Sequence, residues 1–120
     1  MELAREAIST SANPQATLVG SIGPYATYLR DGSEYSGSYV NSDDFDPRTI
    51  VDYYAAQARP LINAGVEDLL FETIPSMAEV DCLEQVVERF PPGLRIWISI
   101  TCKVQYTPTH RGHPSAANGA

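Results

Sequence analysis

The sequence predicts an α/β fold in which parallel strands alternate with helices. Three short segments rich in β-branched and aliphatic residues, at 17–22, 68–73 and 95–101, have the composition of buried strands. Two stretches with helical apolar spacing, 46–65 and 76–90, separate these strands. This alternation of strands and helices indicates right-handed crossovers and a parallel sheet.

The first elements are a short helix and a strand that ends in a glycine-rich turn. Apolar residues recur at helical spacing over 2–9, and Asn13-Pro14 ends that pattern. The strand at 17–22 runs into Gly20-Ser21-Ile22-Gly23-Pro24, where glycine and proline bring bare backbone to the sheet edge. In parallel α/β proteins this edge, at the carboxyl ends of the strands, binds ligands.

The next segment, 23–45, is predicted to be a long loop. It is rich in Gly, Ser, Asp and Tyr and has too little apolar periodicity for a regular element. A loop of this length in a compact domain is typical of a functional segment or of disorder. Its position directly after a strand favours a functional segment.

Both longer helices carry start signals. Asp46-Pro47 is an N-cap followed by proline at the first helical position, and Gly65 ends this helix. Ser76 and Glu79 have the spacing of a capping box, in which each side chain bonds the other residue's backbone N–H.

Composition disfavours several kinds of partner. With 15 acidic against 8 basic residues, the net charge of −7 argues against nucleic acid and anionic membranes, which select basic surfaces.

No apolar run approaches the roughly 20 residues needed to span a bilayer. The N-terminus lacks a signal-peptide layout. Two cysteines, Cys82 and Cys102, do not make a disulfide framework, so a reducing, cytoplasmic location is expected.

The sequence divides into a folded part at 1–103 and a tail at 104–120. The tail is composed mainly of Thr, Pro, His, Gly, Ser, Ala and Asn and is predicted to be disordered. His110 and His113 have a spacing that metal ligands sometimes use, but no predicted element would hold them in place. We therefore assign no metal ligand there.

Three ordered motifs closely resemble the homocysteine S-methyltransferase family. They are Val19–Tyr25 followed by Asp31-Gly32-Ser33-Glu34-Tyr35, then Leu70–Pro75, then Trp97–Ile100. The family consists of zinc-dependent (β/α)8 barrels that transfer a methyl group to homocysteine and form methionine. A complete barrel needs roughly 250 residues. The resemblance, over residues 1–103, therefore implies a partial (β/α)8 TIM barrel with about three parallel strands.

Glu72 is the first candidate site residue. A carboxylate at the end of an apolar strand is partly desolvated and should seek a cation. From the residues alone it could equally cap the next helix or pair with an arginine. The resemblance implies that Glu72 binds the amino group of homocysteine.

The resemblance places the turn after the first strand in the same substrate pocket. The turn has neither the glycine spacing of a dinucleotide site nor a phosphate-loop lysine. Ser21, Gly23 and Pro24 are therefore expected to act through shape and hydrogen bonding. Ser99 and Thr101 either face this pocket or pack in the core, and Thr101 is included among the substrate-binding residues.

Acidic and aromatic residues of the long loop suggest a second role. Asp31, Glu34, Tyr35 and Tyr39 could form a lid over a cationic sulfonium donor, through charge and cation–π attraction. The alternative is a solvated loop whose tyrosines anchor it to the rim.

The family's zinc ligands are missing from this sequence. The resemblance implies three cysteine thiolates, one in an Asn-Cys pair and two in Gly-Gly-Cys-Cys, and neither pattern occurs in the 120 residues. The family's N-terminal Asp-Gly-Gly strand is also absent. Cys82 is expected to lie in a helix core, and Cys102 matches neither motif. No catalytic residue and no metal ligand is therefore assigned.

The resemblance implies methyl transfer to homocysteine from S-methylmethionine or S-adenosylmethionine. We expect this chain to be a fragment of such an enzyme, from a truncated, misspliced or partial gene model, and inactive alone. A non-catalytic fragment acting through association and a small amino-acid-binding module are the alternatives. Binding of homocysteine by the purified chain would favour the binding module, whereas aggregation would favour the inert fragment.

Overall fold

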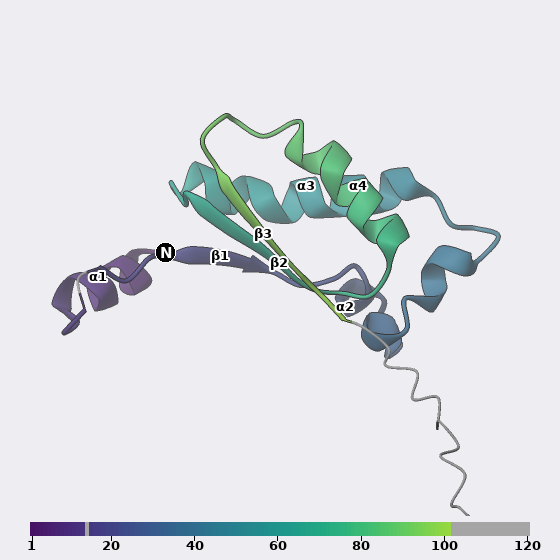
Figure 1. Cartoon of the computed structure of the whole chain (residues 1–120), viewed down its shortest axis with the longest axis horizontal. Coiled ribbons are helices and arrows are strands. Elements are labelled where there is room, and N and C mark those ends of the chain that lie inside the picture. Colours follow the sequence, from purple (N-terminus) through teal and green to yellow (C-terminus); the bar gives the residue numbers. More distant parts are fainter. Residues whose placement is uncertain (14, 102–120) are drawn as a thin grey trace, which may run out of the picture.

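Three parallel strands form the centre of the computed structural model, which describes residues 1–13 and 15–101. In chain order the elements are α1 (Glu2–Thr10), β1 (Val19–Ile22), α2 (Ala26–Leu29), the 3-10 helices η1 (Ser33–Tyr35) and η2 (Ser38–Asn41), α3 (Pro47–Asn63), β2 (Asp68–Ile74), α4 (Met77–Val87) and β3 (Arg95–Ile100) (Figure 1). The predicted α/β alternation is confirmed. The predicted tail at 104–120 lies outside the described residues.

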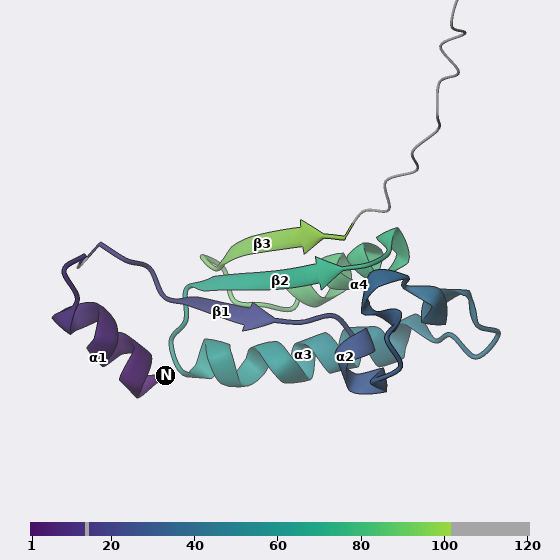
Figure 2. The ribbon, with the colours of Figure 1, turned by 90° about the horizontal axis from the view of Figure 1, so that it is seen from below.

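The strands lie in the order β1-β2-β3, so each follows its neighbour in sequence. Ser21 is opposite Leu70, and Leu70 is opposite Trp97. Figure 2 shows the three strands pointing the same way, toward α2 and the 3-10 helices. Their carboxyl ends therefore meet at one edge, as the crossover argument predicts.

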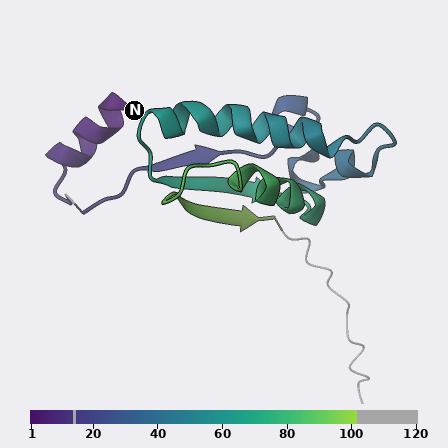
Figure 3. The same ribbon diagram turned by 90° about the horizontal axis from the view of Figure 1, so that it is seen from above.

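The helices α3 and α4 cover one face of the sheet (Figure 3). Alternate residues of the strands point to this face and are buried there. The core they form with the two helices consists of Ile22, Ile50, Val51, Tyr54, Ala58, Val66, Leu69, Phe71, Ile74, Cys82, Leu83 and Val86. No helix or strand within the described ranges covers the opposite face, where Trp97 is 57% exposed.

The two long helices begin where the sequence predicts. The Asp46 carboxylate accepts a hydrogen bond from the Arg48 N–H at 2.9 Å, and Pro47 takes the first helical position. Ser76 accepts a hydrogen bond from the Glu79 N–H at 3.2 Å. The capping box is only half formed, however, because the Glu79 carboxylate makes its bonds elsewhere.

Segment 23–45 is more ordered than predicted. It contains α2, η1 and η2, which are single turns held by local bonds such as Gly37 N–H to Ser33 O at 2.8 Å. Left-handed backbone at Arg30, Gly32 and Gly37, with φ of 58°, 80° and 60°, separates the turns. Short turns of this kind need no apolar periodicity, and for that reason the pattern did not reveal them.

The helix α1 lies beside the amino end of the sheet and contributes no buried residue. Its Arg5 guanidinium donates to the carbonyl oxygens of Ala64 and Gly65, at 2.6 and 3.0 Å. Carbonyl groups at the C-terminal end of a helix lack intrahelical donors, and a cationic side chain donates to them favourably. Within residues 1–13 and 15–101, no helix is both long and apolar enough to cross a membrane.

At the amino edge of the sheet a buried carboxylate joins β2 to β3. Asp68 is 2% exposed and accepts hydrogen bonds from Arg95 Nε at 2.6 Å, Arg95 Nη2 at 2.5 Å and Trp97 Nε1 at 3.2 Å. The Arg95 hydrogen bonds lower the pKa of Asp68 to about 2, against the opposing effect of burial. This bidentate pair fixes the strand register at the end of the sheet opposite to the ligand edge.

Acid should remove the stabilisation that Asp68 provides. Its pKa of about 2 in the folded chain lies below the value of about 3.9 expected in the unfolded chain. The contribution is therefore complete above roughly pH 4 and is lost as the pH falls through about 2. Urea unfolding at stepped pH should show a shallower acid dependence for Asp68→Asn than for the native chain.

The strand β2 is distorted next to Glu72. The register with β3 shifts between Phe71 and Ile74, and Thr73 has a φ of 64°. The left-handed region is sterically unfavourable for a β-branched residue. The Thr73 N–H donates to Ser99 Oγ at 3.1 Å, so a side chain of β3 replaces the regular ladder bond. Strain of this kind is typical of ligand-binding edges.

Relief of this strain should stabilise the chain. Thr73→Asn places a residue that tolerates left-handed backbone at the bulge and should raise the free energy of unfolding by about 1 kcal/mol. Chemical denaturation measures the change. Thr49→Asn, in the regular helix α3, is the matched control and should give no gain. Equal effects of the two substitutions would show that Thr73 stores no strain.

Candidate functional site

A cleft of about 500 Å³ opens at the carboxyl ends of β1 and β2. One wall comes from the end of β2, and the other comes from the segment that follows β1. The lining residues are Gly23, Pro24, Ala26, Thr27, Arg30, Gly32, Glu34, Tyr35, Glu72 and Thr73. The fold thus brings Gly23, Pro24 and Glu72, all predicted site residues, into one cavity.

Glu72 is half-buried in this cleft and accepts a hydrogen bond from Ser21 Oγ. The parallel register makes this contact possible, since Ser21 lies opposite Leu70 and Glu72 is the next residue on the same face. Neither structural alternative for Glu72 is found in the described part of the chain. The helix α4 is capped by Ser76, and no arginine within residues 1–13 and 15–101 lies within ion-pair distance of Glu72.

One hydroxyl uses only part of the acceptor capacity of a carboxylate. Ionised Glu72 can accept about four hydrogen bonds, of which Ser21 provides one. The remaining lone pairs face a cleft open to solvent. This arrangement suits a cationic ligand group with several N–H donors, such as an ammonium.

The third strand contributes less directly. Thr101 lies at the same sheet edge, where its N–H donates to Ile74 O at 2.9 Å, but it is not among the residues that line the cleft. Ser99 uses its hydroxyl oxygen to accept the Thr73 N–H. The geometry therefore brings Ser21, Gly23, Pro24 and Glu72 together, whereas Thr101 lies at the same sheet edge but outside the cleft lining.

The loop residues divide between two roles. Glu34 and Tyr35 line the cleft, and the Tyr35 side chain is 64% exposed. Asp31 instead accepts hydrogen bonds from the N–H and the hydroxyl of Ser33, which lower the pKa of its carboxyl. Tyr39 turns away from the cleft and donates to Glu79. Two of the four proposed lid residues therefore face the cavity, while Tyr39 anchors the loop.

Two features of the site were not predicted from the sequence. Of the described residues that line the cleft, Arg30 is the one basic residue, a position set by its left-handed backbone at the end of α2. Glu79 is fully buried and accepts from the Tyr25 N–H at 2.9 Å and from the hydroxyls of Tyr39 and Tyr54. Its spacing from Ser76 resembled a capping box, and this resemblance concealed its bonds to other elements.

The tyrosines around Glu79 pack edge to face. The ring centroid of Tyr25 lies 5.3 Å from that of Tyr53 and 5.7 Å from that of Tyr39. The centroids of Tyr54 and Phe71 are 5.4 Å apart. Burial raises the pKa of both Tyr39 and Tyr54, and the neighbouring Glu79 carboxylate raises it further. These hydroxyls therefore remain protonated donors at any physiological pH.

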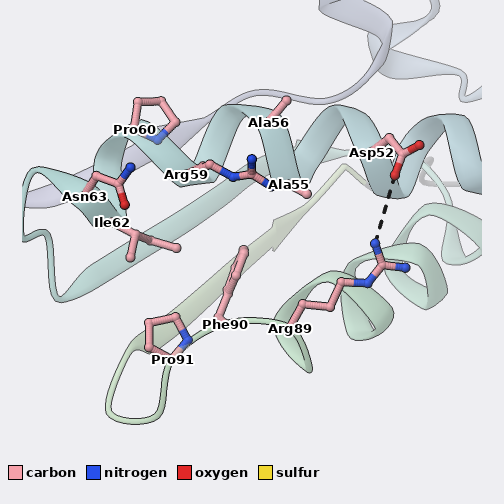
Figure 4. A pocket seen from close by; sticks show the side chains of 10 residues that line it. All are labelled: Asp52, Ala55, Ala56, Arg59, Pro60, Ile62, Asn63, Arg89, Phe90 and Pro91. Atoms are coloured by element: carbon pink, nitrogen blue, oxygen red, sulfur yellow. Dashed lines mark ion pairs between the residues drawn. The ribbon is translucent and has the colours of Figure 1, made fainter.

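A larger groove of about 780 Å³ lies elsewhere, between α3 and the segment after α4. Figure 4 shows Phe90 and Pro91 facing α3, with Arg89 paired to Asp52 at 4.0 Å. Because α3 and α4 end toward the amino edge of the sheet, this groove is remote from the carboxyl ends of the strands. Its apolar floor and exposed ion pair offer no acceptor arrangement like that at Glu72.

The described residues do not fit a metal ion. Residues 1–13 and 15–101 contain no group of three or more His, Cys, Asp or Glu side chains placed to hold one. Cys82 is 2% exposed within α4, and burial raises the pKa of its thiol, which disfavours the thiolate that zinc binds. Cys102, His110 and His113 lie outside the described part.

Comparison with known proteins identifies a family that matches this chain. The family described as Homocysteine S-methyltransferase matches residues 1–118, which extends past residue 103, where the sequence pattern ends the folded part. Homocysteine S-methyltransferase of Escherichia coli is 38% identical over 112 residues, covering 86% of this chain and 33% of that protein. YbgG of Bacillus subtilis, a homocysteine S-methyltransferase, is 37% identical over 90 residues, covering 75% and 27%.

A solved structure agrees with these sequence relatives. The metallated form of the homocysteine methyltransferase MmuM from Escherichia coli matches with a TM-score of 0.72 and 34% identity, over 83% of this chain and 35% of that one. The predicted partial barrel is thereby confirmed for the three-stranded unit. The chain spans about a quarter to a third of the length of these relatives. From the family match over nearly its whole length, the chain belongs to the homocysteine S-methyltransferase family.

Proposed function

We propose that the cleft beside Glu72 binds homocysteine and forms one wall of a methyl-transfer site. The observation that carries this proposal is the half-buried Glu72 carboxylate, which Ser21 orients and which no cationic side chain of the described residues neutralises. An α-ammonium group supplies both the positive charge and the three donors that the carboxylate lacks. Ser21 would keep the carboxylate in place.

The surrounding residues would shape the site and supply a second electrostatic element. Gly23 and Pro24 bring backbone close to the ligand without bulky side chains, and Thr101 would support the edge from β3. Glu34 and Tyr35 stand on the opposite wall, where a carboxylate and an aromatic ring attract a cationic sulfonium. The methyl donor of the whole protein would be S-methylmethionine or S-adenosylmethionine.

The proposal separates ligand binding from catalysis in this chain. In the family, zinc lowers the pKa of the homocysteine thiol so that it reacts as a thiolate. The described residues provide no ligand set for that ion. We therefore propose amino-acid binding by residues 1–103 and no methyl transfer by the chain alone.

Removal of the Glu72 charge should weaken homocysteine binding. Glu72→Gln keeps the shape but loses the ionic component, which is expected to raise Kd by about 10- to 100-fold. Isothermal titration calorimetry measures Kd directly. Glu67→Gln, at an exposed carboxylate beyond the opposite end of β2, is the matched control and should bind as the native chain does. Equal affinities of the two variants would remove Glu72 from the site.

The chain alone should neither hold zinc stoichiometrically nor form methionine. A catalytic zinc site needs about three protein ligands and one open position. Metal analysis of the purified chain and an assay with homocysteine and each donor test this expectation. One zinc per chain together with methionine formation would contradict it. Loss of that zinc on substitution of His110 or His113 would place the ligands in the tail.

A further inference from the structure

We propose that Glu79 is a positioning residue that holds the loop wall of the cleft in its binding geometry. Glu79 is buried in the first turn of α4 and does not line the cleft. The effect of Glu79 on ligand affinity rests on the function proposed above. Its effect on the order of the loop does not depend on that function. The two parts can therefore be measured separately.

The bonds of Glu79 join three separate elements. Its Oε1 accepts from the Tyr25 N–H at 2.9 Å and from the Tyr54 hydroxyl, and its Oε2 accepts from the Tyr39 hydroxyl. Tyr25 lies directly after the glycine–proline turn, Tyr39 belongs to η2, and Tyr54 belongs to α3. One carboxylate thus fastens the loop to two helices of the core.

The two loop contacts bracket the wall of the cleft. On the loop side, the lining residues lie between Gly23 and Tyr35. Tyr25 fixes the start of this stretch and Tyr39 fixes the chain just beyond its end. Between them, Gly37 packs so closely on the start of α4 that an added Cβ would lie 3.1 Å from Pro75 O. Movement of Glu79 or loss of its acceptors therefore changes the position of the wall.

The chemistry of the contact requires an acceptor-only group. All three partners donate, and an ionised carboxylate accepts at both oxygens. Glutamine has nearly the same shape, but its amide nitrogen is a donor. With its oxygen kept toward Tyr25 and Tyr54, the Glu79→Gln amide nitrogen faces the Tyr39 hydroxyl, which must then turn its proton away. The substitution therefore disturbs the hydrogen bond from Tyr39, which lies just beyond the end of the loop wall. A buried polar mismatch of this kind costs free energy of folding.

The decisive experiment compares Glu79→Gln with Val86→Ala. Val86 is fully buried on the same helix but contacts the core rather than the loop, so its truncation destabilises the fold without touching the wall. In the Glu79→Gln chain, hydrogen exchange should accelerate at the amides of Arg30 and Gly37, which close turns of the loop. Homocysteine Kd should rise by about tenfold. Val86→Ala should change neither quantity at temperatures where the chain is folded.

A second variant keeps the test valid if Glu79→Gln unfolds. Tyr39→Phe removes one donor without introducing a new one, and it should accelerate exchange at Gly37 more than at Arg30. Where Glu79→Gln folds, the same substitution in the Glu79→Gln background removes the mismatched partner, so its effect on exchange should be smaller than in the native chain. Such coupling is not expected from two independent structural contacts.

The outcomes separate the two proposals. Faster loop exchange and weaker binding in Glu79→Gln, with Val86→Ala unchanged, support positioning. Unchanged loop exchange in both Glu79→Gln and Tyr39→Phe overturns it, as does an equal loss of affinity in Val86→Ala. If the native chain binds no homocysteine, the proposed function fails, and the exchange measurements alone decide whether Glu79 orders the loop.

Discussion

The parallel register of β1 and β2 is the constraint on which the candidate site depends. It places Ser21 opposite Leu70, so that the side chain of Ser21 lies next to that of Glu72 on the open face. A shift of one residue would turn Glu72 into the core beneath α3 and α4, where its charge would have no partner. The packing of Leu69 and Phe71 on the helix-covered face therefore determines which side chains reach the cleft. The same strand register thus determines both which side chains form the core and which ones reach the cleft.

Two buried carboxylates stabilise opposite edges of the sheet in different ways. Asp68 is paired with a guanidinium, which compensates its charge and joins β2 to β3. Among the described residues, Glu79 is bonded by neutral donors, two tyrosine hydroxyls and one backbone N–H. Removal of Arg95 would leave the buried charge of Asp68 without its cation. Loss of one tyrosine hydroxyl would leave Glu79 with two further donors. The two carboxylates therefore depend on their partners in different ways.

Local signals in the sequence were enough to predict the regular elements, whereas the role expected for Glu72 came from the family resemblance. The caps at Asp46 and Ser76, the apolar strands and the glycine–proline turn all depend on neighbouring residues. The bulge at Thr73 and the bonds of Glu79 depend on segments far apart in sequence, so local sequence patterns do not predict them. The short turns of the loop arise from single hydrogen bonds rather than from periodicity. Sequence reasoning therefore predicted where the ligand edge lies better than how its wall is held.

Recognition of an amino acid and activation of its sulfur need different groups, and the described residues at the cleft supply candidates for recognition alone. In the proposed site, an ammonium would be recognised by the Glu72 carboxylate, which the Ser21 hydroxyl of the adjacent strand orients. A thiol at neutral pH is mostly protonated, and making it a nucleophile requires a nearby positive charge. Among the described residues that line the cleft, Arg30 is the one cation, and it lies on the loop side of the cleft rather than on the sheet. Carboxylates at Glu34 and Glu72 outnumber it and oppose thiolate formation. An amino acid bound as proposed would therefore keep its thiol protonated unless a further positive charge were brought close to the sulfur.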